Sequence, residues 1–136
     1  MASDVAAAAA SGGAAEQQQH GPCLAAEAVV QKQLEAYNAR DIEAFMALMS
    51  DDCVAKDAVT GAVMAQGKEQ LRERYTNRFK TAVYSELLGR LCLGDVVVDR
   101  EIISGLPDGA TADCLATYHC AGGKITRMEF VWKPRA

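Results

Sequence analysis

The fold is decided by residues 29–75, which read VVQKQLEAYNARDIEAFMALMSDDCVAKDAVTGAVMAQGKEQLRERY. Two segments in this stretch carry apolar side chains at helical spacing, and a short break at Asn38–Asp41 separates them. Asp41 is placed to cap the second helix. A short strand ending in a carboxylate follows, and then a third helix that begins after a glycine. The order of these elements predicts helices that pack together against a sheet.

The three predicted helices extend from Pro22 to about Asn38, from Asp41 to Met49, and from about Lys68 to Lys80. Each has an apolar stripe that is expected to face a shared core. The stripes are Val30, Leu34 and Tyr37, with Gln33 beside them, on the first helix; Ile42, Phe45, Met46 and Met49 on the second; and Leu71, Tyr75 and Phe79 on the third.

The rest of the chain is predicted to form strands. Two short strands, at residues 53–56 and 62–65, lie within the opening stretch. Glycine-containing turns then divide the second half into four longer runs that are typical of strands. Strands joined by short turns form an antiparallel meander, and three helices covering one face of it give an α+β fold. The four runs are about residues 82–93, 96–104, 111–120 and 124–133.

The composition limits the classes of function. A chain of 136 residues suits one domain, and a net charge of −4 is ordinary for a globular protein. No cluster of lysine or arginine suggests a surface that follows a phosphate backbone, so we expect no nucleic-acid partner. Apolar runs are short and interrupted by charges, so we expect no membrane-spanning segment and no membrane partner.

The first 21 residues differ from the remainder. They contain alanine runs, two adjacent glycines and three adjacent glutamines, but almost no large apolar side chain. Such a segment cannot bury enough surface to offset its ordering entropy, which predicts a disordered tail over residues 1–21 and a domain over 22–136. The tail has neither the pattern of a secretory signal nor the arginines of a mitochondrial one. A cytoplasmic location is therefore expected, with a chloroplast location left open.

Five cysteines occur without any C-x-x-C pair. With no secretory signal, reduced thiols are the expected state, and small core residues are the expected role. A structural zinc site needs closely spaced ligand pairs, which this sequence lacks. We therefore expect no metal and no cofactor. The five residues are Cys23, Cys53, Cys92, Cys114 and Cys120.

Several segments, in this order, resemble the SnoaL-like and ketosteroid-isomerase-like families of the nuclear transport factor 2-like superfamily, over roughly residues 24–133. The resemblance implies a cone-shaped curved sheet that is packed against three helices around a small-molecule pocket. Its segments are patterns of fold and turn rather than catalytic signatures. They are AYNARDIEAF (36–45), SDDCV (50–54), GKEQLRERY (67–75), GDVVVDRE (94–101) and GKITRMEF (123–130).

In ketosteroid isomerases an aspartate moves a proton, while a tyrosine and a protonated aspartic acid hold the enolate oxygen. The resemblance places the base at Asp57. It places Gln33 at the position of the tyrosine, with Tyr37 one turn later, and Ala116 near the position of the second acid. The base is therefore matched and the two oxyanion donors are not, which implies a loss of efficient steroid chemistry unless other groups replace them.

Asp57 has two interpretations. Its apolar neighbours Ala58 and Val59 would raise its pKa by desolvation and suit it to proton transfer. Alternatively, Asp57 is a solvated carboxylate at a strand end, facing a turn. The candidate replacement donors are Gln33, Tyr37, Tyr118 and His119.

Only one of Tyr118 and His119 can face a pocket, because side chains alternate along a strand. The remaining candidates for the pocket wall are aromatic or flexible apolar residues, which also suit an ordinary core. These candidates are Phe45, Met49, Tyr75, Phe79 and Trp132.

Charged residues alternate with apolar ones along two of the long strands. Asp99 and Glu101 share a strand face with Val97 and Ile103, and Arg127 alternates with Met128. These charges are interpreted as belonging to the outer face of the sheet, where they pair across strands. The resemblance implies that this outer face makes a homodimer.

Two functions are consistent with these observations. The first is binding of a small apolar carbonyl compound, with acid/base isomerase or cyclase activity through Asp57, and with Gln33 or Tyr118 polarising the carbonyl. The second is a non-catalytic module for ligand binding, dimerisation or protein interaction, of which a transport adaptor is a less favoured form. Replacing Asp57 with Asn separates them, because only the first function requires that carboxylate.

Overall fold

The computed structural model describes residues 21–135, and these fold into three α-helices and one six-stranded sheet. Of the tail predicted over residues 1–21, residues 1–20 lie outside the described part, and Gly21 is the first residue of the first helix. Within that part, no helix combines the length and apolar character needed to cross a membrane.

In chain order the elements are α1 (Gly21–Ala39), α2 (Ile42–Met46), β2 (Met49–Asp57), β3 (Val63–Gln66), α3 (Gly67–Arg78), β4 (Tyr84–Leu93), β5 (Val96–Ser104), a short 3-10 helix η3 (Pro107–Gly109), β6 (Ala112–Ala121) and β7 (Lys124–Pro134).

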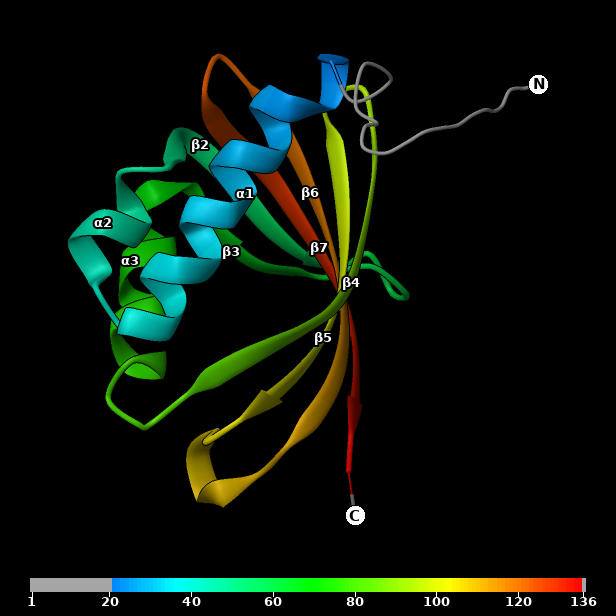
Figure 1. The fold of residues 1–136 in the computed structure, drawn as a ribbon. Helices are drawn as coiled ribbons and strands as arrows, with labels where there is room; N and C mark the ends of the chain where they lie inside the picture. The colour runs from blue at the N-terminus through cyan, green and yellow to red at the C-terminus, as the bar shows by residue number, and fades with distance from the viewer. Residues whose placement is uncertain (1–20, 136) are drawn as a thin grey trace.

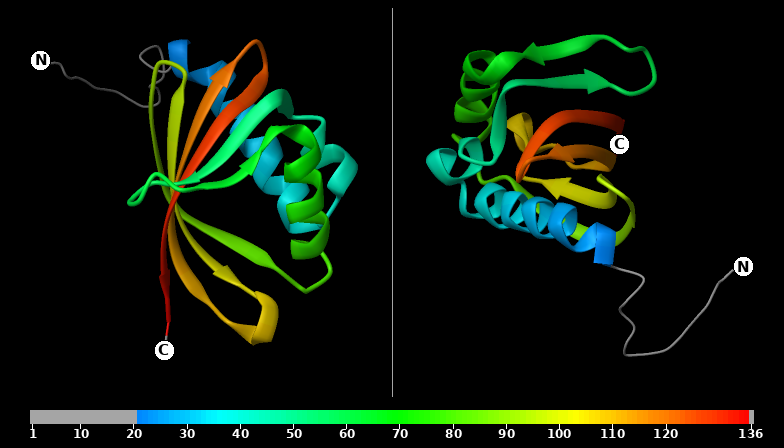
Figure 2. Two further views of the ribbon diagram at one scale, coloured as in Figure 1. Left: turned by 180° about the vertical axis from the view of Figure 1, so that it is seen from behind. Right: turned by 90° about the horizontal axis from the view of Figure 1, so that it is seen from above.

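The sheet is strongly curved, and the helices cover its concave side (Figures 1 and 2). The strand order is β3-β2-β7-β6-β5-β4. The predicted antiparallel meander of β4 to β7 is confirmed, but β2 pairs with β7 in parallel, so the sheet is mixed. Tight turns force antiparallel neighbours, whereas the long connection between β2 and β7 carries no such restriction. The predicted α+β cone is otherwise confirmed.

The second helix is shorter than predicted. Asp41 caps it as expected, since its carboxylate accepts a hydrogen bond of 3.1 Å from the Ala44 amide. The helix ends at Met46, however, and Met49 is the first residue of β2. Met49 is still fully buried, so the apolar spacing correctly identified a core residue although it belongs to a strand.

Asp99 and Glu101 lie on the inner face of β5, so their predicted position on the outer face is wrong. Their exposed fractions are 0% and 4%, and the alternating Val97 and Ile103 are buried on the same face. The inner position is possible because Arg90 on β4 forms two hydrogen bonds with the Asp99 carboxylate, at 2.7 and 2.9 Å. A buried charge requires such a partner.

The outer face of β5, β6 and β7 carries charged pairs, as predicted. Arg127 lies 3.4 Å from Glu129 on the same strand, β7, and Arg100 on β5 lies 2.9 Å from Asp113 on β6. Asp99 and Glu101 are not among these outer-face charges.

Two of the five cysteines form a disulfide, which corrects the prediction of reduced thiols for that pair. Cys23 near the start of α1 is bonded to Cys92 near the end of β4, 69 residues later. The fold brings their Cα atoms to 6.0 Å, a separation typical of disulfides. Cys53, Cys114 and Cys120 are free and buried, as expected of small core residues.

Candidate functional site

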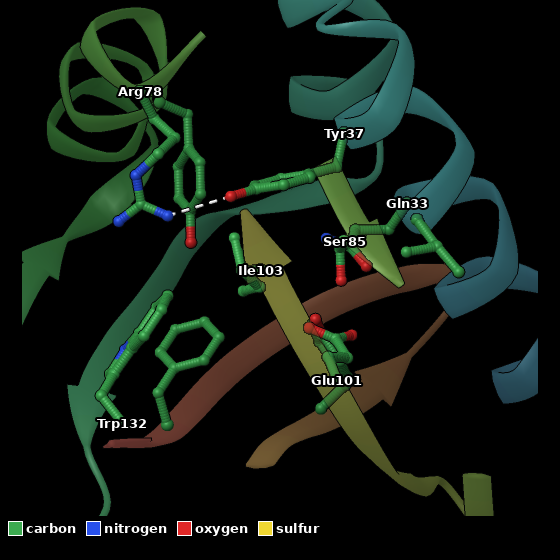
Figure 3. A pocket seen from close by; sticks show the side chains of 11 residues that line it. Gln33, Tyr37, Arg78, Ser85, Glu101, Ile103 and Trp132 are labelled. Atoms are coloured by element: carbon green, nitrogen blue, oxygen red, sulfur yellow. Dashed lines mark hydrogen bonds between the residues drawn. The ribbon is translucent and has the colours of Figure 1, made fainter. Parts of the chain in front are cut away.

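A small cavity lies between α1, α3 and the concave face of the sheet (Figure 3). Its volume is about 20 Å³, which holds roughly one water molecule. Leu34, Ile103 and Phe130 are among its apolar walls. Its amide, hydroxyl, carboxyl and guanidinium groups come from five different elements and belong to Gln33, Tyr37, Tyr75, Arg78, Ser85, Glu101 and Tyr118.

Glu101 is the carboxyl group of the cavity, and its pKa is strongly raised. Burial is the main cause that raises the pKa of Glu101 to about 7, and the nearby negative charge of Asp99 raises it further. The Ser85 hydroxyl and the Arg90 guanidinium oppose this shift but do not cancel it. Near neutral pH the carboxyl group can therefore both accept and donate a proton.

Two buried polar atoms beside Glu101 are unsatisfied. The Oε1 atom of Gln33 has no hydrogen-bond partner within residues 21–135, and the Oγ atom of Ser85 forms no hydrogen bond of ordinary geometry there, although its hydroxyl lies close enough to the Glu101 carboxyl to lower the pKa of that group. Figure 3 shows the polar ends of Gln33, Ser85 and Glu101 gathered on one side of the cavity. Because an unpaired buried polar group costs about 1–3 kcal/mol, these atoms are suited to bind a polar group of a ligand or a water.

The other side of the cavity carries phenols and one arginine. Arg78 donates a hydrogen bond of 3.0 Å to the hydroxyl oxygen of Tyr37. Burial raises the pKa of Tyr37, and it raises the pKa of Tyr118 well above its ordinary value. Both phenols therefore stay neutral at physiological pH and keep an O–H group that can donate to a carbonyl oxygen.

The structure brings five of the predicted site residues together around the cavity and leaves the other five outside its wall, three of them in the core. Phe45 and Met49 are fully buried core residues, and Phe79 packs against the same core. Phe45 and Phe79 belong to an aromatic cluster whose ring centroids lie 5.5 Å apart. The five predicted residues that do line the cavity are Gln33, Tyr37, Tyr75, Tyr118 and Trp132.

Asp57 lies at the end of β2 and is not part of the cavity wall. Its carboxylate accepts hydrogen bonds of 2.9 Å from the amides of Val59 and Thr60. The bonds from Thr60 and Val59 lower the pKa of Asp57, so the predicted raised pKa is wrong. The geometry agrees with the alternative interpretation of a carboxylate that faces a turn. A catalytic role for Asp57 stays a prediction without a contact that supports it.

His119 points away from the cavity, and Tyr118 is the member of this pair that faces it. The imidazole of His119 lies on the outer face, 3.5 Å from the Glu129 carboxylate and 3.4 Å from the Arg127 guanidinium. It has no contact through which it could replace an oxyanion donor in the cavity. The alternation of side chains along the strand correctly predicted that only one of these two residues faces the cavity.

Three functional candidates were missed from the sequence: Arg78, Ser85 and Glu101. Arg78 follows Leu71 by seven residues and Tyr75 by three, so the helical spacing itself would have placed it on the inner side of α3. Glu101 shares a strand face with the apolar Val97 and Ile103, but the other face of β5 is equally apolar, so the strand pattern alone did not show which face is inner. Ser85 had no signal in the sequence.

The residues described by the structure contain no group of three or more histidine, cysteine, aspartate or glutamate side chains that could hold a metal ion. The polar groups that converge on the cavity are a carboxyl, three phenols, an amide, a hydroxyl and a guanidinium. This set can bind a polar group of a small molecule and can transfer a proton.

The family model for the SnoaL-like domain matches residues 30–128, which extend from α1 into β7. The match therefore includes all or part of every element that lines the cavity. The chain belongs to the SnoaL-like domain family. No curated protein is significantly similar to it in sequence.

Solved structures share the fold of this SnoaL-like domain. An uncharacterised cystatin fold protein from Novosphingobium aromaticivorans is 27% identical, with a TM-score of 0.70 over 79% of this chain and 97% of the other. The Δ5-3-ketosteroid isomerase from a Mycobacterium species is 22% identical, with a TM-score of 0.70 over 80% and 93%. A nuclear transport factor 2-like protein of unknown function from Cytophaga hutchinsonii is 16% identical, with a TM-score of 0.68 over 79% and 89%. The predicted superfamily is confirmed, and these likenesses concern the fold alone.

Proposed function

We propose that this SnoaL-like domain binds a small carbonyl compound in the cavity and that Glu101 carries the acid/base chemistry. The observation that supports this proposal most strongly is the buried Glu101 carboxyl, whose pKa is raised to about 7. A general base works best when its pKa lies near the operating pH. The proposal keeps the predicted isomerase or cyclase class and transfers the role of base from Asp57 to Glu101.

The reaction is a proton transfer next to a carbonyl group. The Glu101 carboxylate takes a proton from the carbon beside the carbonyl, and the electron pair of that bond moves to the carbonyl oxygen. A neutral phenol of Tyr37 or Tyr118 donates a hydrogen bond to this oxygen, which stabilises the developing charge. The protonated Glu101 then returns the proton to another carbon of the same ligand, so the protein ends unchanged.

The non-catalytic alternative is favoured by a different observation. The cavity volume of about 20 Å³ is far below the roughly 300 Å³ of an ordinary ligand pocket. A domain whose cone-shaped interior is filled by side chains serves as an interaction module without turnover. The two functions differ in whether any ligand undergoes proton exchange.

Deuterium exchange tests the proposal. We expect the wild-type protein, incubated in heavy water with a panel of planar enolisable ketones, to incorporate deuterium beside the carbonyl, as measured by proton NMR. Glu101→Gln removes the base and is expected to abolish this exchange. Asp57→Asn is the matched control, because it changes a carboxylate that caps a turn outside the cavity.

Three other results would contradict the proposal. Exchange that survives Glu101→Gln but is lost in Asp57→Asn would restore Asp57 as the base. Ketone binding without exchange would support the non-catalytic module. Loss of exchange in both variants, with unchanged circular dichroism, would mean that neither carboxylate acts alone.

We also propose that the outer sheet face forms a homodimer. Leu91 and Leu93 on β4 are 76% and 85% exposed, and Leu115 and Val131 add exposed apolar side chains on β6 and β7. Apolar groups on an exposed sheet face are typical of an association surface.

Sedimentation velocity checks the dimer. The wild type is expected to sediment as a dimer and the Leu91→Asp/Leu93→Asp variant as a monomer. Val59→Asp is the control, because Val59 is equally exposed but lies in the β2–β3 turn. A monomeric wild type would contradict the proposal.

A further inference from the structure

A second hollow, here called the outer groove, lies next to the cavity. It has a volume of about 450 Å³ and is bounded by α3, β3, the connection from β5 to β6, and the end of β7. Its apolar walls are formed by Met64, Leu106, Pro107, Trp132 and Pro134. This volume lies within the range of pockets that hold small organic molecules.

Two guanidinium groups border this apolar groove. Arg74 and Arg78 are one turn apart on α3, and both line the groove. The Nε atom of Arg74 is buried and has no hydrogen-bond acceptor within the described chain. Arg78 bonds only to the neutral phenol of Tyr37, and its guanidinium lies 5.4 Å from the ring centroid of Trp132.

Within residues 21–135, neither of these arginines has a carboxylate partner, whereas five of the other six arginines do and the sixth, Arg40, donates a hydrogen bond to the Val83 carbonyl. Glu73 lines the adjoining hollow together with both arginines but forms no ion pair with either of them. Five other arginines form ion pairs at 2.7–3.4 Å; they are Arg72, Arg90, Arg100, Arg127 and Arg135. Two partly buried positive charges beside an apolar wall therefore lack a negative partner in the described part of the chain.

We propose that the outer groove binds a small amphipathic carboxylate. Its apolar body would lie against Trp132, Leu106 and Pro107, and its carboxylate would pair with Arg74 and Arg78. A planar guanidinium matches a carboxylate with two parallel hydrogen bonds, which makes arginine the suitable residue for this role. Desolvation of the groove by the apolar body strengthens the pairing.

The groove and the cavity share two residues. Arg78 and Trp132 line both hollows, so they form the partition between the apolar groove and the cavity that contains Glu101. A carboxylate that pairs with Arg78 competes with the bond from Arg78 to Tyr37. The proposed ligand class deepens the proposed function. Only an effect of the bound carboxylate on the chemistry in the Glu101 cavity rests on that function. Binding in the groove does not require Glu101.

A fluorescence titration tests this inference, because Trp132 is the only tryptophan of the chain. The probes are adamantane-1-carboxylate and the neutral adamantane-1-carboxamide, which have the same apolar body. At about pH 8 the carboxylate is ionised. We expect the carboxylate to bind at least about tenfold more tightly than the amide, which corresponds to about 1.4 kcal/mol.

The variant Arg74→Gln/Arg78→Gln is expected to reduce this preference to within about twofold while the amide still binds. Arg72→Gln, on the same helix but paired with Glu43, should keep the preference. Arg78→Lys, which keeps the charge but not the planar fork, should keep part of it. Each variant is first checked for a native circular dichroism spectrum.

Equal affinity for the two probes, no binding of either, or a preference that survives in the double variant would each overturn the inference. Glu101→Gln is expected to leave the carboxylate preference unchanged. The inference can therefore fail while proton exchange by Glu101 persists. Equally, exchange can be absent while the groove selects carboxylates.

Discussion

Glu101→Gln is expected to stabilise the folded protein by about 3 kcal/mol above pH 7 and to leave its stability unchanged below pH 4.5. Burial raises the pKa of Glu101 from 4.5 to about 7, so the folded state holds a proton that the unfolded state releases. The stability contributed by this protonated carboxyl is fully present below pH 4.5. It is lost as the pH rises towards 7, where the buried group ionises. A glutamine has the same shape and no charge to bury.

Urea denaturation of the wild type and the variant, at intervals between pH 4 and pH 8.5, measures the difference. Glu43→Gln provides a control of opposite sign. The hydrogen bond from Arg72 lowers the pKa of Glu43, so its contribution is present above pH 4.5 and is lost as the pH falls. Glu43→Gln should therefore not gain stability at high pH. A constant difference between wild type and Glu101→Gln at every pH would contradict the raised pKa.

The same substitution is expected to lower the rate of deuterium exchange by about a hundredfold or more, which is the usual contribution of a general base. Stabilisation combined with loss of exchange is typical of a residue that is retained for function at a cost in stability. Replacing a residue that has a purely structural role would lower the stability of the folded protein. The two measurements together thus separate a functional Glu101 from a structural one.

Local patterns predicted much of the fold. The apolar spacing located α1 and α3, the Asp41 cap was recognised from the sequence, and the glycine turns identified the four long strands. These features depend on residues close in the chain. The parallel pairing of β2 with β7 depends on contacts more than 70 residues apart, and nothing in either strand specified its direction.

The site was predicted less completely because two decisive features are tertiary. Both faces of β5 carry apolar and charged side chains, and only the position of α1 decides which face is covered. In addition, the ladder of β4 and β5 has an irregularity between Leu87 and Gly89, after which Arg90 lies opposite Asp99. A bulge of this kind shifts the alternation of side chains, which turns Arg90 inward. Without this shift, no arginine would neutralise Asp99.

This inward arginine leads to the largest expected loss of stability. Arg90→Met keeps the length of the side chain and removes the charge, which leaves the fully buried Asp99 without its partner. Breaking a buried pair in this way costs about 3–5 kcal/mol. The side chain of Arg90 is only 14% exposed, and it also donates a 3.0 Å hydrogen bond to Gln31 on α1, so its loss also removes a hydrogen bond between the helix and the sheet.

Urea denaturation at neutral pH measures the loss for Arg90→Met, and Arg72→Met is the matched control. Arg72 also forms two hydrogen bonds with one carboxylate, at 2.8 and 3.2 Å, but its pair with Glu43 is exposed. We expect a much smaller loss there, because exposed pairs are screened by solvent. Equal losses in the two variants would contradict the argument from burial.

The double variant Arg90→Met/Asp99→Leu distinguishes an unpaired charge from lost packing. Because replacing both members of a buried pair by apolar residues is often neutral, it should recover most of the stability that Arg90→Met loses. The positive charge of Arg90 also lowers the pKa of Glu101. Arg90→Met should therefore move the Glu101-linked stability transition to higher pH. A transition that stays in place would contradict the coupling between the charge of Arg90 and the Glu101 carboxyl.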